Sequence, residues 1–220
     1  MASPSENLPL GRMAPPVPAG VEIPPEPPDV GARALSVAAR LLAGASTFFF
    51  LAFVFAYFYL RSLNQGHLWR PAHVKPDQGL GAAMIACVVA SVLLTIVSGR
   101  QMKAKSPAWF VPAVGGLVLG LVAIALQCIE YTTQHFGPTD GAYASVFCAW
   151  TALYLIAVLS TMYWLETNVA SARRARRQRA PARDIKDPDR LISAGFDAAV
   201  FYWSFLAAIG LVTYVTLYLL

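Results

Sequence analysis

The side chains best suited to chemistry in this chain lie in one short polar stretch. Gln127, Glu130 and Tyr131 close one long apolar run, and Asp140 and Tyr143 stand at the start of the next. Residues three apart share a face of a helix, so Gln127 and Glu130 point the same way about one turn below the polar boundary. These two side chains either fix the chain's own hairpin, dock a neighbouring protein, or mark the point where a helix leaves lipid.

The apolar runs on either side predict membrane-spanning helices. The segment 106–129 has 24 residues without a charge, and 141–165 has 25 more. A helix that rises ~1.5 Å per residue needs ~20 apolar residues to cross the hydrocarbon core of a bilayer. The polar stretch between them is therefore the apex of a transmembrane hairpin, and its acidic residues lie at one membrane surface.

The composition supports a membrane protein. Of the 220 residues, 57% are hydrophobic and 13% are charged, which excludes an ordinary soluble domain. The net charge of +5 does not indicate a nucleic-acid partner, because fourteen of the 17 Lys and Arg residues flank apolar runs. Charges in such places set the orientation of membrane helices.

We predict an all-α integral membrane protein, a bundle of five transmembrane helices. Nine prolines among residues 1–35 predict a Pro-rich cytoplasmic tail, which could also lie as a strap along a partner. The membrane domain follows at 36–220. Its predicted spans are 41–61, 78–99, 106–130, 141–166 and 197–220.

The positions of the basic residues predict the orientation. With five spans, the N-terminal tail, the turn at 100–105 and the loop at 166–197 share one side, and they hold fourteen basic residues against three on the other. Basic residues accumulate on the cytoplasmic side, so we expect a cytoplasmic N-terminus and an external C-terminus. The arginine-rich loop also suits contact with anionic lipid or with an acidic partner surface.

No cofactor site is expected in this chain. Haem and copper sites inside membranes use histidines on facing helices, whereas all three histidines here fall in loops. The three cysteines lie inside apolar runs without CxxC spacing, so we interpret them as small core residues. The residues concerned are His67, His73, His135, Cys87, Cys128 and Cys148.

Small residues at helical spacing predict close contacts between helices. Ala82, Ala86 and Ala90 form one stripe in the second span, and Gly116 and Gly120 stand in GxxxG spacing in the third. The tyrosines and tryptophan of the last span, Tyr218 among them, fit the aromatic belt at a membrane surface.

Four segments resemble subunit III of the haem–copper terminal oxidases, especially cytochrome c oxidase subunit III. LQCIEY followed by DGAYASVF is the most specific match, to the family's LLQxxEY and DGxYGSxFF motifs. AFVFAYFYLRSL at 52–63 is similar to its FFWAF-type helix, and FYWSF with TYVTLYLL to its closing helix. Trp69-Arg70-Pro71 looks like its WPP motif, with Arg70 in place of the first proline.

The resemblance implies a short, five-helix bacterial form that lacks the first two helices of longer members. It implies a multi-pass protein of the bacterial inner membrane that packs on oxidase subunits I and II and on lipid. Bound phospholipid is expected, whereas haem and copper would belong to the partner subunits. The structural and docking positions implied are Trp69, Gln127, Glu130, Tyr131, Asp140, Gly141, Tyr143, Ser145 and Trp203.

The chain departs from the family where the family has buried ionisable groups. Neutral residues stand instead at Ser46, Tyr154, Ala157, Ser204 and Ala207. A proton-relay role is therefore not carried over from the resemblance.

The expected function is that of a subunit without a redox site, which supports electron transfer from cytochrome c to oxygen and the coupled proton uptake. Within the superfamily, the alternative is an accessory subunit of a quinol oxidase or nitric oxide reductase. Outside it, the alternatives are a small transporter and an assembly factor. The absence of charged residues near the middle of any span argues against the transporter.

Overall fold

The computed structural model describes residues 30–63, 69–177 and 188–220. Most of the predicted Pro-rich tail therefore lies outside the described residues, as do His67 and the centre of the arginine-rich loop.

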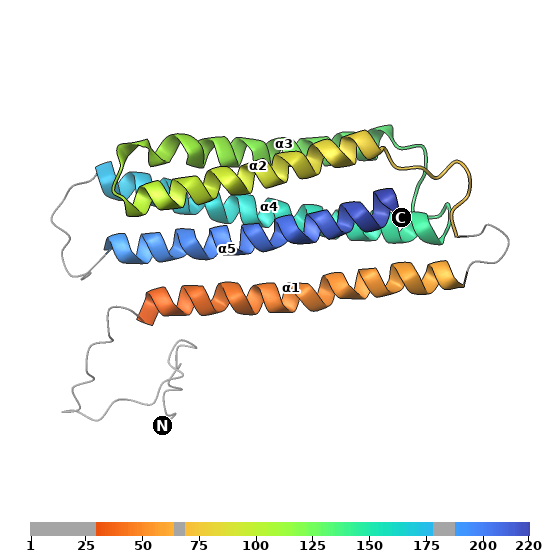
Figure 1. Cartoon of the computed structure of the whole chain (residues 1–220), viewed down its shortest axis with the longest axis horizontal. Helices are drawn as coiled ribbons and strands as arrows, with labels where there is room; N and C mark the ends of the chain where they lie inside the picture. The colour runs from red at the N-terminus through yellow and green to blue at the C-terminus, as the bar shows by residue number, and fades with distance from the viewer. Residues whose placement is uncertain (1–29, 64–68, 178–187) are drawn as a thin grey trace, which may run out of the picture.

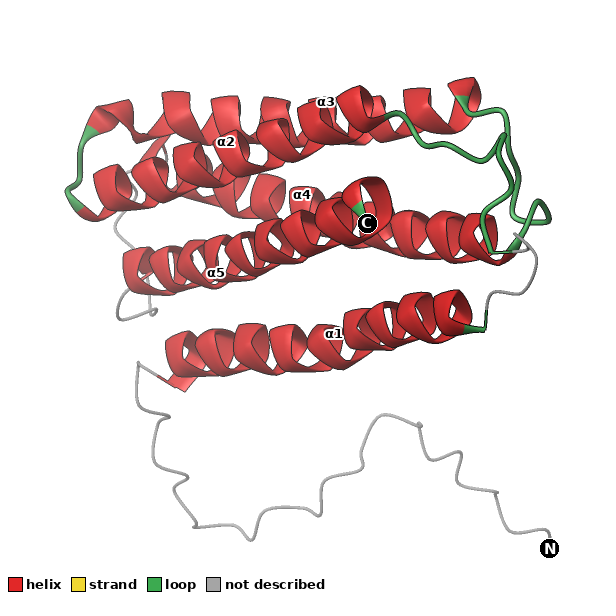
Figure 2. Ribbon diagram, turned by 45° about the vertical axis from the view of Figure 1, so that its right-hand side comes forward, coloured by secondary structure: helices red, strands yellow, loops and turns green. Residues whose placement is uncertain are grey.

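All the regular secondary structure in the described part of the chain is helical, and five of its helices are long and apolar enough to cross a membrane (Figures 1 and 2). The predicted all-α, five-span architecture is thus confirmed. The elements are α1 (Val30–Ser62), α2 (Gln78–Lys103), the 3₁₀ turn η1 (Pro107–Trp109), α3 (Phe110–Thr133), α4 (Ala142–Arg177), α5 (Pro188–Tyr214) and the π-helical turn η2 (Val215–Leu219).

The helices run side by side, and successive helices alternate in direction (Figure 1). α5 lies at the centre, where it contacts α1, α2 and α4, and α3 packs on α2 and α4. α1 packs on α5 and α4 and is the least buried of the five. We call the end with the turn at 134–141 and the C-terminus the apex end. The opposite end, with the turn at 104–106, is called the basic end.

Several helices extend beyond the predicted spans. α1 begins at Val30, inside the range expected for the tail, because no proline follows Pro28 before the span. α4 continues past 166 to Arg177, and α5 begins at Pro188 instead of 197. The uncharged runs indicate which residues lie in the hydrocarbon core of the membrane. A helix can continue beyond that core, because arginine and alanine both favour helix. Proline is well tolerated at the first helical position.

The interior is built from large aromatic side chains. Trp150, Trp203, Tyr154 and Phe147 are among the largest fully buried side chains, and they join α4 and α5 to the neighbouring helices. A smaller cluster around Trp109 closes the basic end.

The two glycines of the GxxxG pattern lie at tight helix contacts. A Cβ on Gly116 would lie 2.7 Å from Thr95 Cγ2 and 3.1 Å from the carbonyl oxygen of Ser91, both on α2. Gly120 faces Met162 of α4 in the same way. By contrast, Ala82 and Ala86 of the other stripe are exposed, so they lie on the outer face of α2.

Replacing Gly116 with alanine tests the α2–α3 contact. We expect Gly116→Ala to lower the free energy of unfolding by about 1–3 kcal/mol, because overpacking forces the helices apart. Gly44→Ala is the matched control, since a Cβ there has no neighbour within 4 Å. Thermal unfolding in detergent measures both. Equal stability of the two variants would contradict the contact.

Candidate functional site

The polar apex is organised around the carboxyl group of Glu130. This residue lies in the last turn of α3 and is 2% exposed. Its Oε2 accepts hydrogen bonds from Gln127 Nε2 at 2.9 Å and from the hydroxyl of Tyr218 at 2.7 Å. The pair of Gln127 and Glu130 therefore ties α3 to the end of the last helix of the same chain.

The chain around Tyr218 is held by two further side chains. The hydroxyl of Tyr143, on α4, donates to the carbonyl oxygen of Leu217, and Gln78 Nε2, on α2, donates to that of Tyr218 at 2.8 Å. Gly81 lets the tyrosine ring approach α2, since a Cβ there would lie 2.6 Å from Tyr218 Cε1. Three helices thus converge on the π-helical turn η2.

Tyr143 also closes the apex from the side of α1. Its ring packs against Tyr57, Trp69 and Phe147, with centroids 5.7 to 6.3 Å away. The guanidinium of Arg70 lies 4.5 Å from the Tyr143 ring centroid. A cation over an aromatic face is stabilising, which gives a physical role to the arginine that replaces proline in the motif.

The turn between α3 and α4 is fixed by its own polar residues. Asp140 Oδ2 accepts from the Gly137 N–H at 2.6 Å, and the Ser145 hydroxyl donates to the carbonyl oxygen of Pro138 at 2.5 Å. Gly141 has φ of 129°, a value that residues with a side chain rarely adopt. Tyr131 joins the two helices further in, because its hydroxyl donates to Thr151 Oγ1 at 2.7 Å.

Trp203 belongs to a separate network inside the bundle. Its Nε1 donates to Ser91 Oγ at 3.0 Å, and that hydroxyl donates to the carbonyl oxygen of Gly116 at 2.6 Å. One serine therefore links α5, α2 and α3. Of the positions taken from the resemblance, the apex brings together Trp69, Gln127, Glu130 and Tyr143, whereas Trp203 contributes elsewhere.

Sequence reasoning missed several partners in these networks. Tyr218 is 2% exposed and bonded to Glu130, so its assignment to an interfacial belt was wrong. Periodicity could not show that Ser91 bonds to other helices, because a serine in an apolar helix can equally donate its hydroxyl to the backbone of its own helix. The FYWSF match singled out Trp203 as a structural position, but it did not identify Ser91 as the acceptor of its hydrogen bond.

Three of the positions that depart from the family, Ser46, Tyr154 and Ser204, make neutral hydrogen bonds. The Tyr154 hydroxyl donates to the carbonyl oxygen of Leu206 at 3.1 Å, and Ser204 bonds to its own helix at Val200. The hydroxyls of Ser46 and Tyr202 lie 2.9 Å apart and join α1 to α5. These contacts stabilise the bundle without any ionised group.

The described residues offer no group of three or more His, Cys, Asp or Glu side chains that could hold a metal ion. Cys87 and Cys148 are half-buried, but Cys128 is exposed, so its interpretation as a core residue was wrong.

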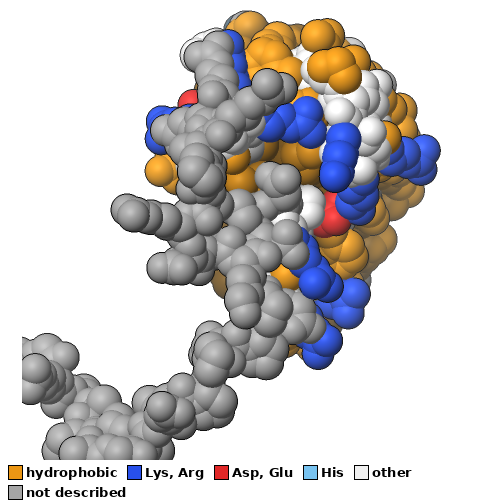
Figure 3. Space-filling model, turned by 90° about the vertical axis from the view of Figure 1, so that its left-hand side faces the viewer, with side chains coloured by type: hydrophobic (Ala, Val, Ile, Leu, Met, Phe, Trp, Pro, Cys, Tyr) orange, Lys and Arg blue, Asp and Glu red, His pale blue; other side chains and the backbone are white. Residues whose placement is uncertain are grey.

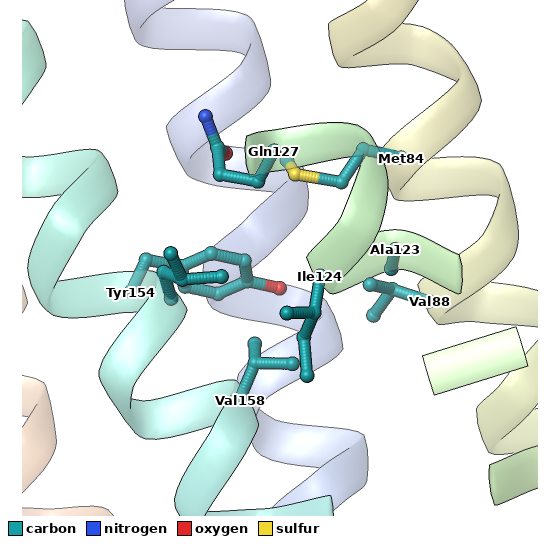
Figure 4. A pocket seen from close by; sticks show the side chains of 8 residues that line it. Met84, Val88, Ala123, Ile124, Gln127, Tyr154 and Val158 are labelled. Atoms are coloured by element: carbon teal, nitrogen blue, oxygen red, sulfur yellow. The ribbon is translucent and has the colours of Figure 1, made fainter. Parts of the chain in front are cut away.

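A small cavity lies between α2, α3 and α4, lined mainly by apolar side chains together with Gln127 and Tyr154 (Figure 4). Its volume of about 10 Å³ leaves room for about one water molecule.

These features define a class: a multi-pass helical membrane protein whose helices are joined by hydrogen bonds from buried side chains such as Glu130, Tyr143 and Trp203. The family model of cytochrome c oxidase subunit III matches residues 31–220, and the chain belongs to that family.

Curated relatives show how distant the similarity is. The chain is 27% identical over 190 residues to cytochrome c oxidase subunit 3 of Latimeria chalumnae, covering 81% of this chain and 66% of that protein. It is 28% identical over 189 residues to that of Gallus gallus, with the same coverage, and 21% identical over 192 residues to that of Neurospora crassa, covering 84% and 67%. The chain thus spans about two thirds of the length of these relatives.

Removing the Tyr218 hydroxyl tests the tie at the apex. We expect Tyr218→Phe to lower the free energy of unfolding by roughly 1–3 kcal/mol, because the buried Oε2 of Glu130 loses one of its two donors. Tyr163→Phe removes the hydroxyl of a lipid-facing ring that is 70% exposed, and should leave stability unchanged. Denaturation of both variants in the same detergent measures the difference. A Tyr218→Phe protein as stable as the control would refute the tie.

Proposed function

We propose that this chain is the subunit III of a respiratory haem–copper oxidase, one that receives electrons from cytochrome c. The observation that carries the proposal is the match of the cytochrome c oxidase subunit III family over residues 31–220. In this proposal the protein supports electron transfer and proton uptake by packing on subunit I and by holding lipid. The haem and copper belong to subunits I and II.

The internal hydrogen bonds are consistent with a supporting role. Glu130, Tyr143 and Trp203 bond within the chain, so their work is to fix the positions of helices. Neutral side chains stand where the family has buried ionisable groups, so the interior formed by the described residues offers no series of acidic groups that could relay protons. Proton uptake would be supported through the position and stability of the catalytic subunit.

The outer face of α2 is the surface we propose for contact with subunit I. Ala82 and Ala86 are exposed on it and Ala90 is half-buried, so another helix could approach closely there. The outer face of α1 differs, because Phe48 and Phe55 are at least 70% exposed on it. Large aromatic side chains hold a neighbouring backbone at a distance, which favours lipid on that side.

The proposal is tested by a pull-down of the full chain in mild detergent, followed by optical spectra of the proteins that come with it. We expect stoichiometric haem-containing partners. A dinuclear copper centre in an accompanying subunit identifies cytochrome c as the donor, and its absence indicates a quinol oxidase or nitric oxide reductase. A chain that purifies without any haem protein would contradict the proposal.

The proposed orientation, with a cytoplasmic N-terminus in a bacterial inner membrane, is tested by accessibility labelling of each loop.

Enlarging Ala86 tests the α2 surface. We expect Ala86→Leu to reduce the amount of haem protein recovered with this chain by about five-fold, since the added carbons keep the partner helix away, while the isolated chain remains folded. Ala125→Leu, on an exposed position of α3, is the control. If both variants recover as much haem protein as the wild type, the α2 face is not the docking surface.

Truncation of Glu130 separates positioning from redox chemistry. Glu130→Ala should loosen association with the oxidase while the haem spectrum of the recovered core stays unchanged, because the carboxyl holds the end of α5 and touches no cofactor. Glu166→Ala, an exposed carboxyl toward the basic end, is the control. Altered haem bands with full association would contradict this assignment.

A further inference from the structure

The surface of the basic end carries positive charges close together. The end of α4 lies against the turn between α2 and α3, because Arg176 donates to the carbonyl oxygens of Ser106 at 3.2 Å and of Met102 at 3.4 Å. Figure 3 shows lysine and arginine side chains gathered over this end of the molecule. The exposed basic side chains of this surface are called the basic patch: Arg100, Lys103, Lys105, Arg173, Arg174 and Arg176.

Most of this charge has no counter-charge within the described part of the chain. Lys103 Nζ lies 2.8 Å from Asp197 Oδ2, and among the described residues no other side chain of the patch has a carboxylate partner. The guanidinium of Arg176 lies 5.0 Å from the ring centroid of Trp109, a contact that holds the cation in place without cancelling its charge. The basic patch therefore attracts an acidic ligand.

The chain itself is acidic just before it enters the bundle. Residues 21–29, with the sequence VEIPPEPPD, contain Glu22, Glu26 and Asp29 and no lysine or arginine. This segment joins α1 at Val30, and α1 begins at the basic end (Figure 1). Three carboxylates are thus tethered to the end of the molecule that carries the basic patch.

The tether is long enough for these carboxylates to reach the patch. Its four prolines favour the extended polyproline conformation, so the eight residues from Glu22 to Asp29 span about 25 Å at ~3.1 Å per residue. α1 packs on α5, and α5 packs on α2. Packed helices lie ~8–10 Å apart, so α2 is roughly 20 Å from α1. The first acid of the segment can therefore reach the turn at 104–106.

We propose that residues 21–29 lie across the basic patch, with Glu22 and Glu26 facing Lys105 and the arginines of α4. Each exposed ion pair is weak by itself. The tether compensates for this weakness, because a segment of the same chain meets the patch at a high effective concentration. In this arrangement the N-terminal segment covers the patch and competes with acidic groups of other molecules. The contact lies within one chain, so it needs no partner subunit.

Zero-length cross-linking with a carbodiimide tests the contact, because the reagent joins a carboxylate to a lysine amine only where the two meet. The full chain is purified in mild detergent, treated at low salt, digested and analysed by mass spectrometry. We expect a cross-link from Lys105 to Glu22 or Glu26. Its yield should fall about five-fold at ~1 M salt, where exposed charges are screened within ~3 Å.

Two other lysines serve as controls in the same low-salt sample. Lys103 already lies 2.8 Å from Asp197, so a cross-link between them shows that the reagent works and that the basic end is folded. Lys75, exposed at the apex end, should form no cross-link with the N-terminal segment. Mixing isotopically labelled and unlabelled chains before the reaction distinguishes a contact within one chain from a contact between two copies.

Charge variants separate attraction from proximity. Arg100→Gln combined with Arg174→Gln keeps every group that the reagent joins, so we expect the yield at Lys105 to fall about five-fold because two ion pairs are lost. Arg61→Gln combined with Lys75→Gln removes the same charge from exposed positions at the apex end, and should leave the yield unchanged.

Five results would overturn the proposal. A missing cross-link at Lys105, while Lys103 still joins Asp197, means that the segment lies elsewhere. Equal yields in the two double variants mean that charge does not hold it. A cross-link found only between labelled and unlabelled chains assigns the patch to a second copy. A cross-link of Lys105 to a co-purified protein, in place of the segment, assigns the patch to that partner. A cross-link that appears only after delipidation assigns it to anionic lipid.

Discussion

A carboxyl group buried inside a helical membrane protein needs hydrogen-bond donors from protein groups, because lipid offers none. Glu130 finds them in Gln127, one turn away on α3, and in Tyr218 at the end of α5. Tyr218 can reach Glu130 because Gly81 leaves room for its ring and because Tyr143 and Gln78 hold the adjoining backbone carbonyls. These contacts satisfy one carboxyl oxygen, Oε2, and they bring α2, α3, α4 and η2 together at the apex end.

A second group of buried hydrogen bonds joins the helices in the middle of the bundle, again between groups of the same chain. Ser91 accepts from Trp203 and donates to the backbone of Gly116, so one hydroxyl satisfies groups on three helices. Both ties include α5, which is therefore held along its length between α2, α3 and α4. With Tyr154 also bonded to α5, the central helix is fixed by neutral hydrogen bonds. Such a bundle suits a protein that offers a rigid surface to its neighbours.

The sequence predicted the features that depend on composition and periodicity. Uncharged runs located the five spans, and the GxxxG spacing identified a tight contact at Gly116. The helices extend beyond the predicted spans, because the thickness of the lipid does not limit a helix that continues into water. The partner of Glu130 could not be predicted, since Tyr218 is 88 residues away and an aromatic belt explained it equally well. Ala82 and Ala86 show a further limit, because a stripe of small residues does not reveal whether its partner lies in the same chain.

The outer faces of α1 and α2 differ in the size of their side chains, and this difference determines what each face can contact closely. A helix can approach another closely only where both present small residues, and attraction between close backbones then replaces the hydrophobic effect that drives association in water. α2 offers such a surface at Ala82 and Ala86, whereas Phe48 and Phe55 of α1 exclude it. Flexible acyl chains can fill the uneven space around large rings, and Arg40 lies on the same helix at the depth of their headgroups. The two faces are therefore suited to different partners, one to protein and the other to lipid, although both are apolar.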